Sequence, residues 1–173
     1  MGFVKLKADV TINDKRVPGI CFLRGMGVGV LVSLLCKDTG NEYCVLVQQP
    51  RIPVGEVAML ELPAGMLDDS GTFTGVAASE LSEECGLTVQ ESNFTDLTEL
   101  AYKDTGFRGI CPSPGGCDEY IRLLYCQFEL TQEEISNMQG RLGGLRDHGE
   151  IITLRIVKME DVWKVCCDTK AIG

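Results

Sequence analysis

Three glutamates recur at helical spacing within residues 74–85, namely Glu80, Glu83 and Glu84. At about 100° per residue, their carboxylates cover roughly a third of a helix's circumference. Alone, such a group is most often a solvated acidic face, and like charges at this spacing weaken an isolated helix. Here a strand ending in Leu60-Glu61-Leu62 and a Pro-Ala-Gly turn precede the helix. Oxygen donors beside a tight turn suit Mg²⁺ or Mn²⁺, so the pattern predicts a metal site.

The helix that carries these glutamates is expected to run from about Thr74 to Cys85. Gly86 follows at the position where a left-handed residue commonly ends a helix. Apolar residues recur along it at intervals of four, which gives it one face for a core. These residues are Ala77, Leu81 and Cys85.

The rest of the chain alternates apolar runs with turn residues, which predicts a mixed sheet with helices packed on it. We therefore expect an α+β fold. Helices are predicted over 131–138, where Thr131 and Glu134 form a capping-box pattern, and over 159–167. Strands are predicted within 1–24 and over 27–35, 43–49, 59–62, 97–102, 120–128 and 151–157.

Composition restricts the function classes. The chain has 173 residues and a formal net charge of −9, which fits one acidic globular domain. Nucleic acids and anionic membranes are bound through Lys and Arg, so neither is an expected partner. A substrate that carries phosphates would need bound divalent metal to offset the local carboxylates.

Nine cysteines stand at irregular spacing without any CxxC pair, and the chain has a single histidine, His148. This odd number does not indicate a disulfide framework, and a structural zinc site is not expected. Cysteines within apolar runs pack as small hydrophobic residues and imply a reducing compartment. Because residues 1–10 also lack the apolar core of a signal peptide, we expect a cytoplasmic protein.

The segment Gly65–Leu87 resembles the Nudix box, which is a glycine, five residues, Glu, seven residues, and then Arg-Glu-apolar-x-Glu-Glu-x-Gly-apolar. Seven positions match in register, which makes the resemblance specific. The matching residues are Gly65, Glu80, Leu81, Glu83, Glu84, Gly86 and Leu87.

Two positions depart from the box, because Gly71 replaces its first Glu and Ser79 replaces its Arg. In the family, that Arg holds the carboxylates in place and the first Glu supports the loop. If the two groups interact in the family, their joint loss is compensatory, because neither charge is left without its partner. The alternative is that their loss weakens activity. The three helix glutamates remain, and they favour an active enzyme.

Further segments resemble the ADP-sugar branch of the family, which includes ADP-ribose, ADP-glucose and UDP-sugar diphosphatases. The resemblance extends over most of the chain, and the segments that carry it are Val17–Gly19, Gly27–Leu35, Gln48–Arg51, Leu60–Leu67 and Ser113–Glu119. The resemblance implies an α/β/α sandwich, with the Nudix domain over 25–173 and an N-terminal β-subdomain over 1–24 that serves dimerisation. A homodimer is therefore expected. A helix usually continues past residue 173 in similar enzymes, so the chain end is either naturally short or truncated.

The resemblance also implies a role for each residue of the metal site. Glu80 and Glu84 would ligate Mg²⁺ (or Mn²⁺), with the Ala64 carbonyl completing the site. Glu83 would ligate a metal or assist the attacking water. Glu150, which follows the Gly-rich loop 141–149, would act as base or further ligand, although a charged residue at a strand start is the plainer interpretation.

Four residues are expected to bind substrate. Arg51 would grip a phosphate in a bidentate contact, unless it is a surface residue at a strand end. Glu61 would hydrogen-bond the substrate or order the site, unless it is an edge-strand carboxylate. Phe107 and Arg108 would stack on or contact the nucleotide from loop 103–119, unless that loop is merely a flexible surface segment.

The predicted function is metal-dependent hydrolysis of the diphosphate bond of a nucleoside diphosphate sugar, which yields a nucleoside monophosphate and a sugar phosphate. Gly71 and Ser79 keep a second class open, a catalytically weak Nudix-fold module that binds nucleotide sugars without turnover. A third alternative is a Nudix hydrolase of another nucleoside diphosphate derivative. A loop histidine such as His148 is usually solvated and is not assigned a role.

Overall fold

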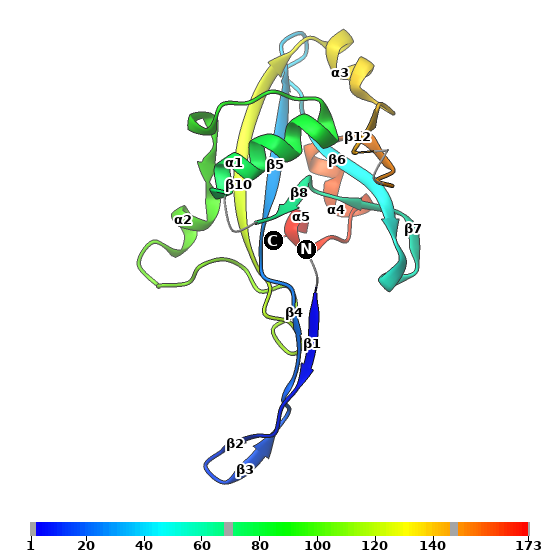
Figure 1. Cartoon of the computed structure of the whole chain (residues 1–173). Helices are drawn as coiled ribbons and strands as arrows, with labels where there is room; N and C mark the ends of the chain where they lie inside the picture. The colour runs from blue at the N-terminus through cyan, green and yellow to red at the C-terminus, as the bar shows by residue number, and fades with distance from the viewer. Residues whose placement is uncertain (1–2, 68–70, 146–148, 173) are drawn as a thin grey trace.

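A mixed β-sheet forms the centre of the chain in a computed structural model that describes residues 3–67, 71–145 and 149–172 (Figure 1). Its main path runs β11-β12-β6-β5-β10-β9, with β7 paired to β6 and β8 paired to β5. The β5–β10 pair is parallel and the other pairs are antiparallel. The strands are β5 (Met26–Cys36), β6 (Glu42–Arg51), β7 (Glu56–Glu61), β8 (Ala64–Met66), β9 (Thr95–Asp96), β10 (Tyr120–Leu130), β11 (Leu142–Gly143) and β12 (Ile152–Lys158).

Helices cover both faces of this sheet, as expected for an α/β/α sandwich. On one face, α1 (Phe73–Glu80) and α3 (Gln132–Met138) pack on alternate residues of β5. On the other face, α4 (Val162–Val165) packs against β6, with α5 (Thr169–Ile172) beside it. Because both of its faces are covered, β5 is a nearly continuous apolar run, which is typical of a central strand.

The glutamate helix ends differently from a regular α-helix. The α-helical part stops at Glu80, and residues Leu81–Cys85 form a π-helical turn. Gly86 then closes the turn in the left-handed conformation at φ 64°, as predicted. A π-turn holds one residue more than an α-turn and is common at functional sites. The directions of Glu83 and Glu84 therefore differ from those expected at 100° per residue.

The prediction of a strand over residues 97–102 was wrong, because this segment is helix α2 (Leu97–Tyr102). Only Thr95–Asp96 pair with β10, as β9. The Asp96 side chain accepts a hydrogen bond from the Glu99 backbone N–H at 2.8 Å and thereby caps the helix. The cap signal outweighed the strand propensity of the apolar residues.

The capping box of α3 is confirmed, with reciprocal bonds between Thr131 and Glu134. The single last helix expected over 159–167 was wrong in its extent. A 3₁₀ turn at Met159–Asp161 leads into α4, which ends at Val165, and Cys166 is extended. A separate helix, α5, follows.

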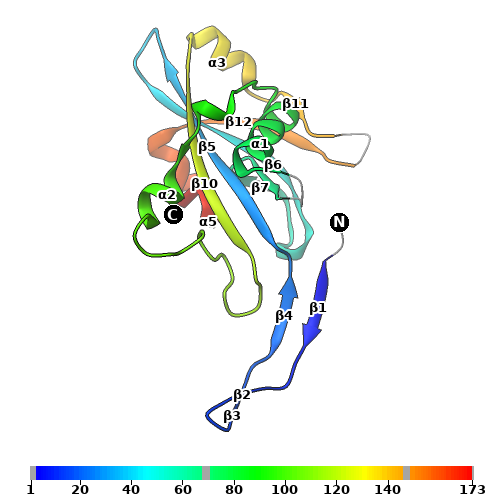
Figure 2. The same cartoon turned by 60° about the vertical axis from the view of Figure 1, so that its left-hand side comes forward.

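The N-terminal segment is an arm of two antiparallel strand pairs that reaches away from the sheet (Figures 1 and 2). One pair joins β1 (Val4–Lys7) to β4 (Ile20–Leu23), and the other joins β2 (Val10–Ile12) to β3 (Lys15–Val17). Asn13 and Asp14 both have positive φ at the tip, as a type I′ hairpin turn requires. The segment therefore holds four short strands, where one or two were expected.

The base of the arm is fastened to loop 113–119. The Phe22 N–H donates to the Gly116 carbonyl at 2.8 Å. The Asp118 carboxylate accepts from the Arg24 N–H at 2.7 Å, and Arg24 pairs with Glu119 at 2.8 Å. Among the described residues, no helix is long and apolar enough to cross a membrane.

Candidate functional site

Glu80 meets the Pro-Ala-Gly turn at Gly65. A Cβ atom added to Gly65 would lie 2.1 Å from Glu80 Oε1, so the carboxylate occupies the space that any side chain would fill. Gly65 is held in place by β8, which pairs with Val28 of β5. The glycine of the box is therefore required by the close approach of the helix glutamate.

Glu84 is buried, with only 6% of its surface exposed, and its Oε2 atom has no hydrogen-bond partner. Burial raises its pKa to about 8, and the charge of Glu80 adds to this shift. An amide contact from Ala64 and the charge of Arg51 act in the opposite direction. The pKa of Glu80 is raised to about 7 by burial and by the charges of Glu83 and Glu150.

The loop before β12 docks on the π-turn. The Gly144 N–H donates to the Glu83 carbonyl at 3.0 Å, and the Glu150 carboxylate accepts from the Leu145 N–H at 3.0 Å. A Cβ at Gly143 would lie 1.8 Å from the Glu84 carbonyl oxygen, so the loop approaches as closely as glycine permits. Glu83 and Glu150 are exposed, and His148 lies outside the described residues.

These four glutamates offer only carboxylate oxygens, the donors that Mg²⁺ and Mn²⁺ prefer. Within residues 3–67, 71–145 and 149–172, no three His, Cys, Asp or Glu side chains are grouped closely enough to hold a metal ion as they stand. Nevertheless, Glu84 Oε2 is buried without a partner, and the pKa values of Glu80 and Glu84 are raised. Both observations indicate that positive charge is missing beside these carboxylates. Glu83 and Glu150 are exposed side chains with room to turn toward it, so the donor set fits a divalent cation.

Arg51 ends β6 opposite Glu56, and Glu61 ends β7 opposite Val47, so the long Arg51 side chain reaches back along the strand pair to Glu61. Their contact is bidentate, at 2.5 Å from Nε to Oε1 and 2.9 Å from Nη2 to Oε2. Glu61 is 6% exposed, whereas 40% of the Arg51 side chain is exposed. The guanidinium therefore keeps free donors toward solvent while Glu61 orients it.

Phe107 and Arg108 lie apart from the glutamates, at the other end of α1. They line a cavity of about 350 Å³ whose other walls include Phe73, Tyr102 and Arg122. The Tyr102 and Phe107 rings meet edge to face at 5.6 Å between centroids. Phe73 and Glu80 are seven positions apart in α1, so the cavity and the glutamates are separated by about 10 Å along the helix axis.

The two departures from the box, Gly71 and Ser79, are both exposed. The guanidinium of Arg51, at the end of β6, lowers the pKa of Glu84 through its charge. Partial electrostatic support for the glutamates is thus present without the arginine of the box.

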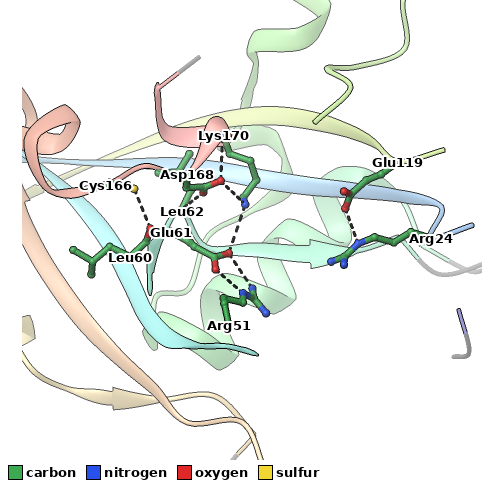
Figure 3. A network of polar contacts seen from close by, with 9 residues as sticks. All are labelled: Arg24, Arg51, Leu60, Glu61, Leu62, Glu119, Cys166, Asp168 and Lys170. Atoms are coloured by element: carbon green, nitrogen blue, oxygen red, sulfur yellow. Dashed lines mark hydrogen bonds and ion pairs between the residues drawn. The ribbon is translucent and has the colours of Figure 1, made fainter. Parts of the chain in front are cut away.

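Sequence reasoning missed two residues beside Glu61, namely Asp168 and Lys170. Lys170 Nζ lies 2.8 Å from Asp168 Oδ1 and 3.6 Å from Glu61 Oε2 (Figure 3). No motif marks them, and the only signal in the sequence was an Asp placed to cap a short helix.

The NUDIX domain family matches residues 25–169 of the chain. This range contains the sheet, its helices and the glutamate turn. The chain therefore belongs to the Nudix family, as the box resemblance predicted, and its mixed sheet between helices is the fold that this membership implies.

Relatives at several distances carry names of the same kind. The chain is 42% identical over 175 residues to Nudix hydrolase 14, chloroplastic, of Arabidopsis thaliana, which covers 99% of this chain and 55% of that protein. It is 26% identical to an ADP-ribose pyrophosphatase of Haemophilus influenzae, over 82% of this chain and 60% of that protein. An ADP-ribose pyrophosphatase of Escherichia coli strain K12 is 27% identical, over 76% and 56% respectively. The chain thus spans little more than half the length of these relatives, and their names support the prediction of a hydrolase.

Proposed function

We propose that this chain hydrolyses the diphosphate bond of a nucleoside diphosphate sugar of the ADP-ribose, ADP-glucose or UDP-glucose type. The products would be a nucleoside monophosphate and a sugar phosphate. The observation that carries this proposal is the pair Glu80 and Glu84 beside the Gly65 turn, where burial and the charge of Glu150 raise the pKa of both. The names of the two ADP-ribose pyrophosphatase relatives support the choice of substrate.

Glu80 and Glu84 would hold Mg²⁺ or Mn²⁺, with Glu83, Glu150 and the Ala64 carbonyl as further ligands. A divalent cation bound there supplies charge neutralisation for a diphosphate and lowers the pKa of coordinated water. Glu84 suits this role because its buried Oε2 has no other partner.

The protein's own side chains would do the remaining work. Arg51, oriented by Glu61, would grip a phosphate oxygen with its free donors. Glu150 or Glu83 would accept the proton of the attacking water, since both carboxylates are exposed and lie beside the buried pair. Positioning and electrostatics would supply most of the rate enhancement.

The nucleoside end of the substrate would reach the cavity at the start of α1. Phe107 would stack on the base there and Arg108 would contact its ribose or phosphate. Three aromatic rings and two arginines line this cavity, which suits a planar group.

The arm, residues 1–24, would form the dimerisation subdomain, and residues 25–173 the Nudix domain. Apolar side chains stand exposed along the arm, and an isolated two-stranded ribbon is marginally stable in water. A second copy of the chain would cover them. A cytoplasmic location is proposed from the nine cysteines, all of which are free thiols.

A catalytically weak module that binds nucleotide sugars is the second candidate. It is favoured by Gly71 and Ser79, which remove two charged groups of the box. Such a module would keep Arg51 and the aromatic cavity but would not turn over its ligand.

Product analysis separates the two candidates. The protein is incubated with Mg²⁺ or Mn²⁺ and, in turn, ADP-ribose, ADP-glucose, UDP-glucose, a dinucleoside polyphosphate and an oxidised nucleoside triphosphate. We expect AMP or UMP together with the sugar phosphate, and a loss of about 10²-fold or more in Glu84→Gln. A folded wild-type protein that binds ADP-ribose in calorimetry without product would support the binding module instead, and turnover of the last two compounds alone would select the other substrate class.

A further inference from the structure

The C-terminal segment runs along the strand that carries Glu61 (Figure 3). The Cys166 thiol donates to the Leu60 carbonyl at 3.0 Å, and the Leu62 N–H donates to Asp168 Oδ2 at 3.2 Å. On its other edge, this strand pairs with β6, where Glu61 is opposite Val47. Glu61 is thus held from two sides, by β6 and by a segment more than a hundred residues away in sequence.

Glu61 is one of four charged groups that lie close together here. Arg51 binds it from the solvent side, and Lys170 approaches its Oε2 from the protein side at 3.6 Å. Lys170 also pairs with Asp168 at 2.8 Å. Glu61 and Asp168 are 6% and 7% exposed, and the Lys170 side chain is 12% exposed, so three of the four groups are almost removed from water.

The group is neutral only with Lys170 present, since two cations then face two carboxylates. Without Lys170, Glu61 and Asp168 would share the single charge of Arg51. A buried carboxylate without its partner is strongly unfavourable. Arg51 would be drawn further inward, and a net negative charge would stand beside the place proposed for a diphosphate.

The path of Lys170 is set by β5. A Cβ atom added to Gly29 would lie 3.1 Å from Lys170 Cδ, so the aliphatic stem of the lysine lies across a residue that has no side chain. Asp168 fixes the other end, because its Oδ1 also accepts from the Lys170 N–H at 3.2 Å in the first turn of α5. The ammonium group is therefore directed at Glu61 by contacts at its stem and at its backbone.

We propose that Lys170 is a positioning residue of the substrate site, which acts through Glu61 on Arg51 and touches no substrate itself. Together with Asp168, it balances the buried carboxylates so that the Arg51 guanidinium stays oriented and its charge remains available to the diphosphate. This inference rests on the proposed function, in which Arg51 binds a substrate phosphate. Burial alone would raise the pKa of Glu61, but Arg51 and then Lys170 hold it below its ordinary value, in agreement with this arrangement.

The test compares Lys170→Met with Lys170→Arg in steady-state hydrolysis of ADP-ribose with Mg²⁺. We expect KM to rise about tenfold in Lys170→Met while kcat changes by less than about threefold, because charge near an anionic ligand acts mainly on binding. Lys170→Arg restores the charge and should recover most of KM. Lys164→Met removes an exposed lysine of α4 and serves as the matched control, with no change expected.

A double variant distinguishes charge balance from a merely structural role. Asp168→Asn/Lys170→Met removes one charge of each sign, so the remaining Arg51–Glu61 pair is neutral again. We expect its KM to lie closer to wild type than that of Lys170→Met. A folded Lys170→Met protein with wild-type KM, or a double variant no better than the single one, would overturn the inference.

The same variants separate this inference from the proposed function. If the wild-type protein hydrolyses none of ADP-ribose, ADP-glucose and UDP-glucose, the proposed function fails, and affinity for inorganic pyrophosphate by calorimetry then tests Lys170 by itself. Weaker binding in Lys170→Met that recovers in the double variant supports its positioning role. Equal affinity in all folded variants contradicts it.

Discussion

Glu84 shows how a residue's surroundings decide its chemistry. Glu83 and Glu84 are neighbours in one turn, yet Glu83 is exposed and Glu84 is 6% exposed. Burial and the charge of Glu80 raise the pKa of Glu84 to about 8. The ionised form of this buried carboxyl is unfavourable unless a cation binds beside it. Binding of a metal cation would therefore be coupled to release of the proton.

The raised pKa values predict that the metal-free protein loses stability as the pH rises. Glu80 and Glu84 have folded-state pKa values of about 7 and about 8, above the ordinary 4.5. Their protonated forms favour folding, so this stability is complete below pH 4.5 and disappears as the pH passes 8. We expect the free energy of unfolding in EDTA to fall by several kcal/mol between pH 5 and pH 9, because each pKa unit of difference contributes about 1.4 kcal/mol.

Urea unfolding at several pH values measures this change. Glu84→Gln is the control, because Gln has no proton to lose, and it should show a flatter profile. Mg²⁺ should raise the midpoint more at pH 8.5 than at pH 6 in the wild-type protein. An equal Mg²⁺ effect at both pH values would contradict the assignment of these glutamates as its ligands.

At the residue scale, spacing identified the glutamates and their glycine, because a 23-residue pattern specifies both a helix and a turn. It gave no indication of Asp168 and Lys170, which meet Glu61 from more than a hundred positions away. Contacts of this kind have no periodic signature, since they depend on how two distant segments pack.

At the scale of elements, the junction between α1 and β8 carries the site. Gly65 contributes by having no side chain, and the π-turn Leu81–Cys85 directs Glu84 inward. The loop before β12 then closes on the turn at Gly143. The geometry of the glutamates thus depends on glycines at two contacts, where a Cβ atom would meet the Glu80 carboxylate or the Glu84 carbonyl.

Gly65→Ala is expected to damage the site more than the fold. The new methyl group would lie 2.1 Å from Glu80 Oε1 and would force this carboxylate to move. Glu80 is a long side chain with room to shift, so we expect a loss of stability of only about 1 kcal/mol but a fall in kcat/KM of about 10²-fold. Kinetics and thermal unfolding of the same preparations measure both effects.

Gly115→Ala is the matched control, because a Cβ there meets nothing within 4 Å. Its kinetics and melting temperature should equal those of the wild type. Full activity in Gly65→Ala would show that Glu80 does not need its place above the turn.

At the scale of the whole molecule, the arm stands out because it cannot bury its own apolar residues. Ile12 is 60% exposed and Ile20 is 56% exposed. Loop 113–119 holds its base through Gly116 and Asp118, so the arm projects in a defined direction. A partner surface is needed to remove these side chains from water.

Replacement of Ile12 and Ile20 by Asp should convert a dimer to a monomer, because two buried carboxylates would oppose an apolar interface. Light scattering after size exclusion reports the mass directly. Leu100→Asp, on the exposed side of α2, alters a similar amount of surface outside the arm and should leave the mass unchanged. A wild-type monomer at micromolar concentration would refute the dimer proposal.

The sequence by itself determined the family, the mixed sheet, the glutamate helix with its Gly86 cap, and the capping box of α3. These features depend on local periodicity and on short patterns of turn and cap residues. Each such pattern lies within a short stretch of the sequence and can be recognised there without the fold. Segment 97–102 was misjudged because its apolar run suits a strand or a short helix, and the Asp96 cap decided for the helix.

The tertiary structure alone decided which charges meet. It buried Glu84, set Arg51 against Glu61, placed Phe107 and Arg108 at a separate cavity, and brought Lys170 beside Glu61. The physical reason is that electrostatic energies depend on distance and burial, and neither is encoded by position along the chain. Packing of α5 against β5 and β7 therefore brings Lys170 to Glu61, a contact that no local pattern in the sequence indicates.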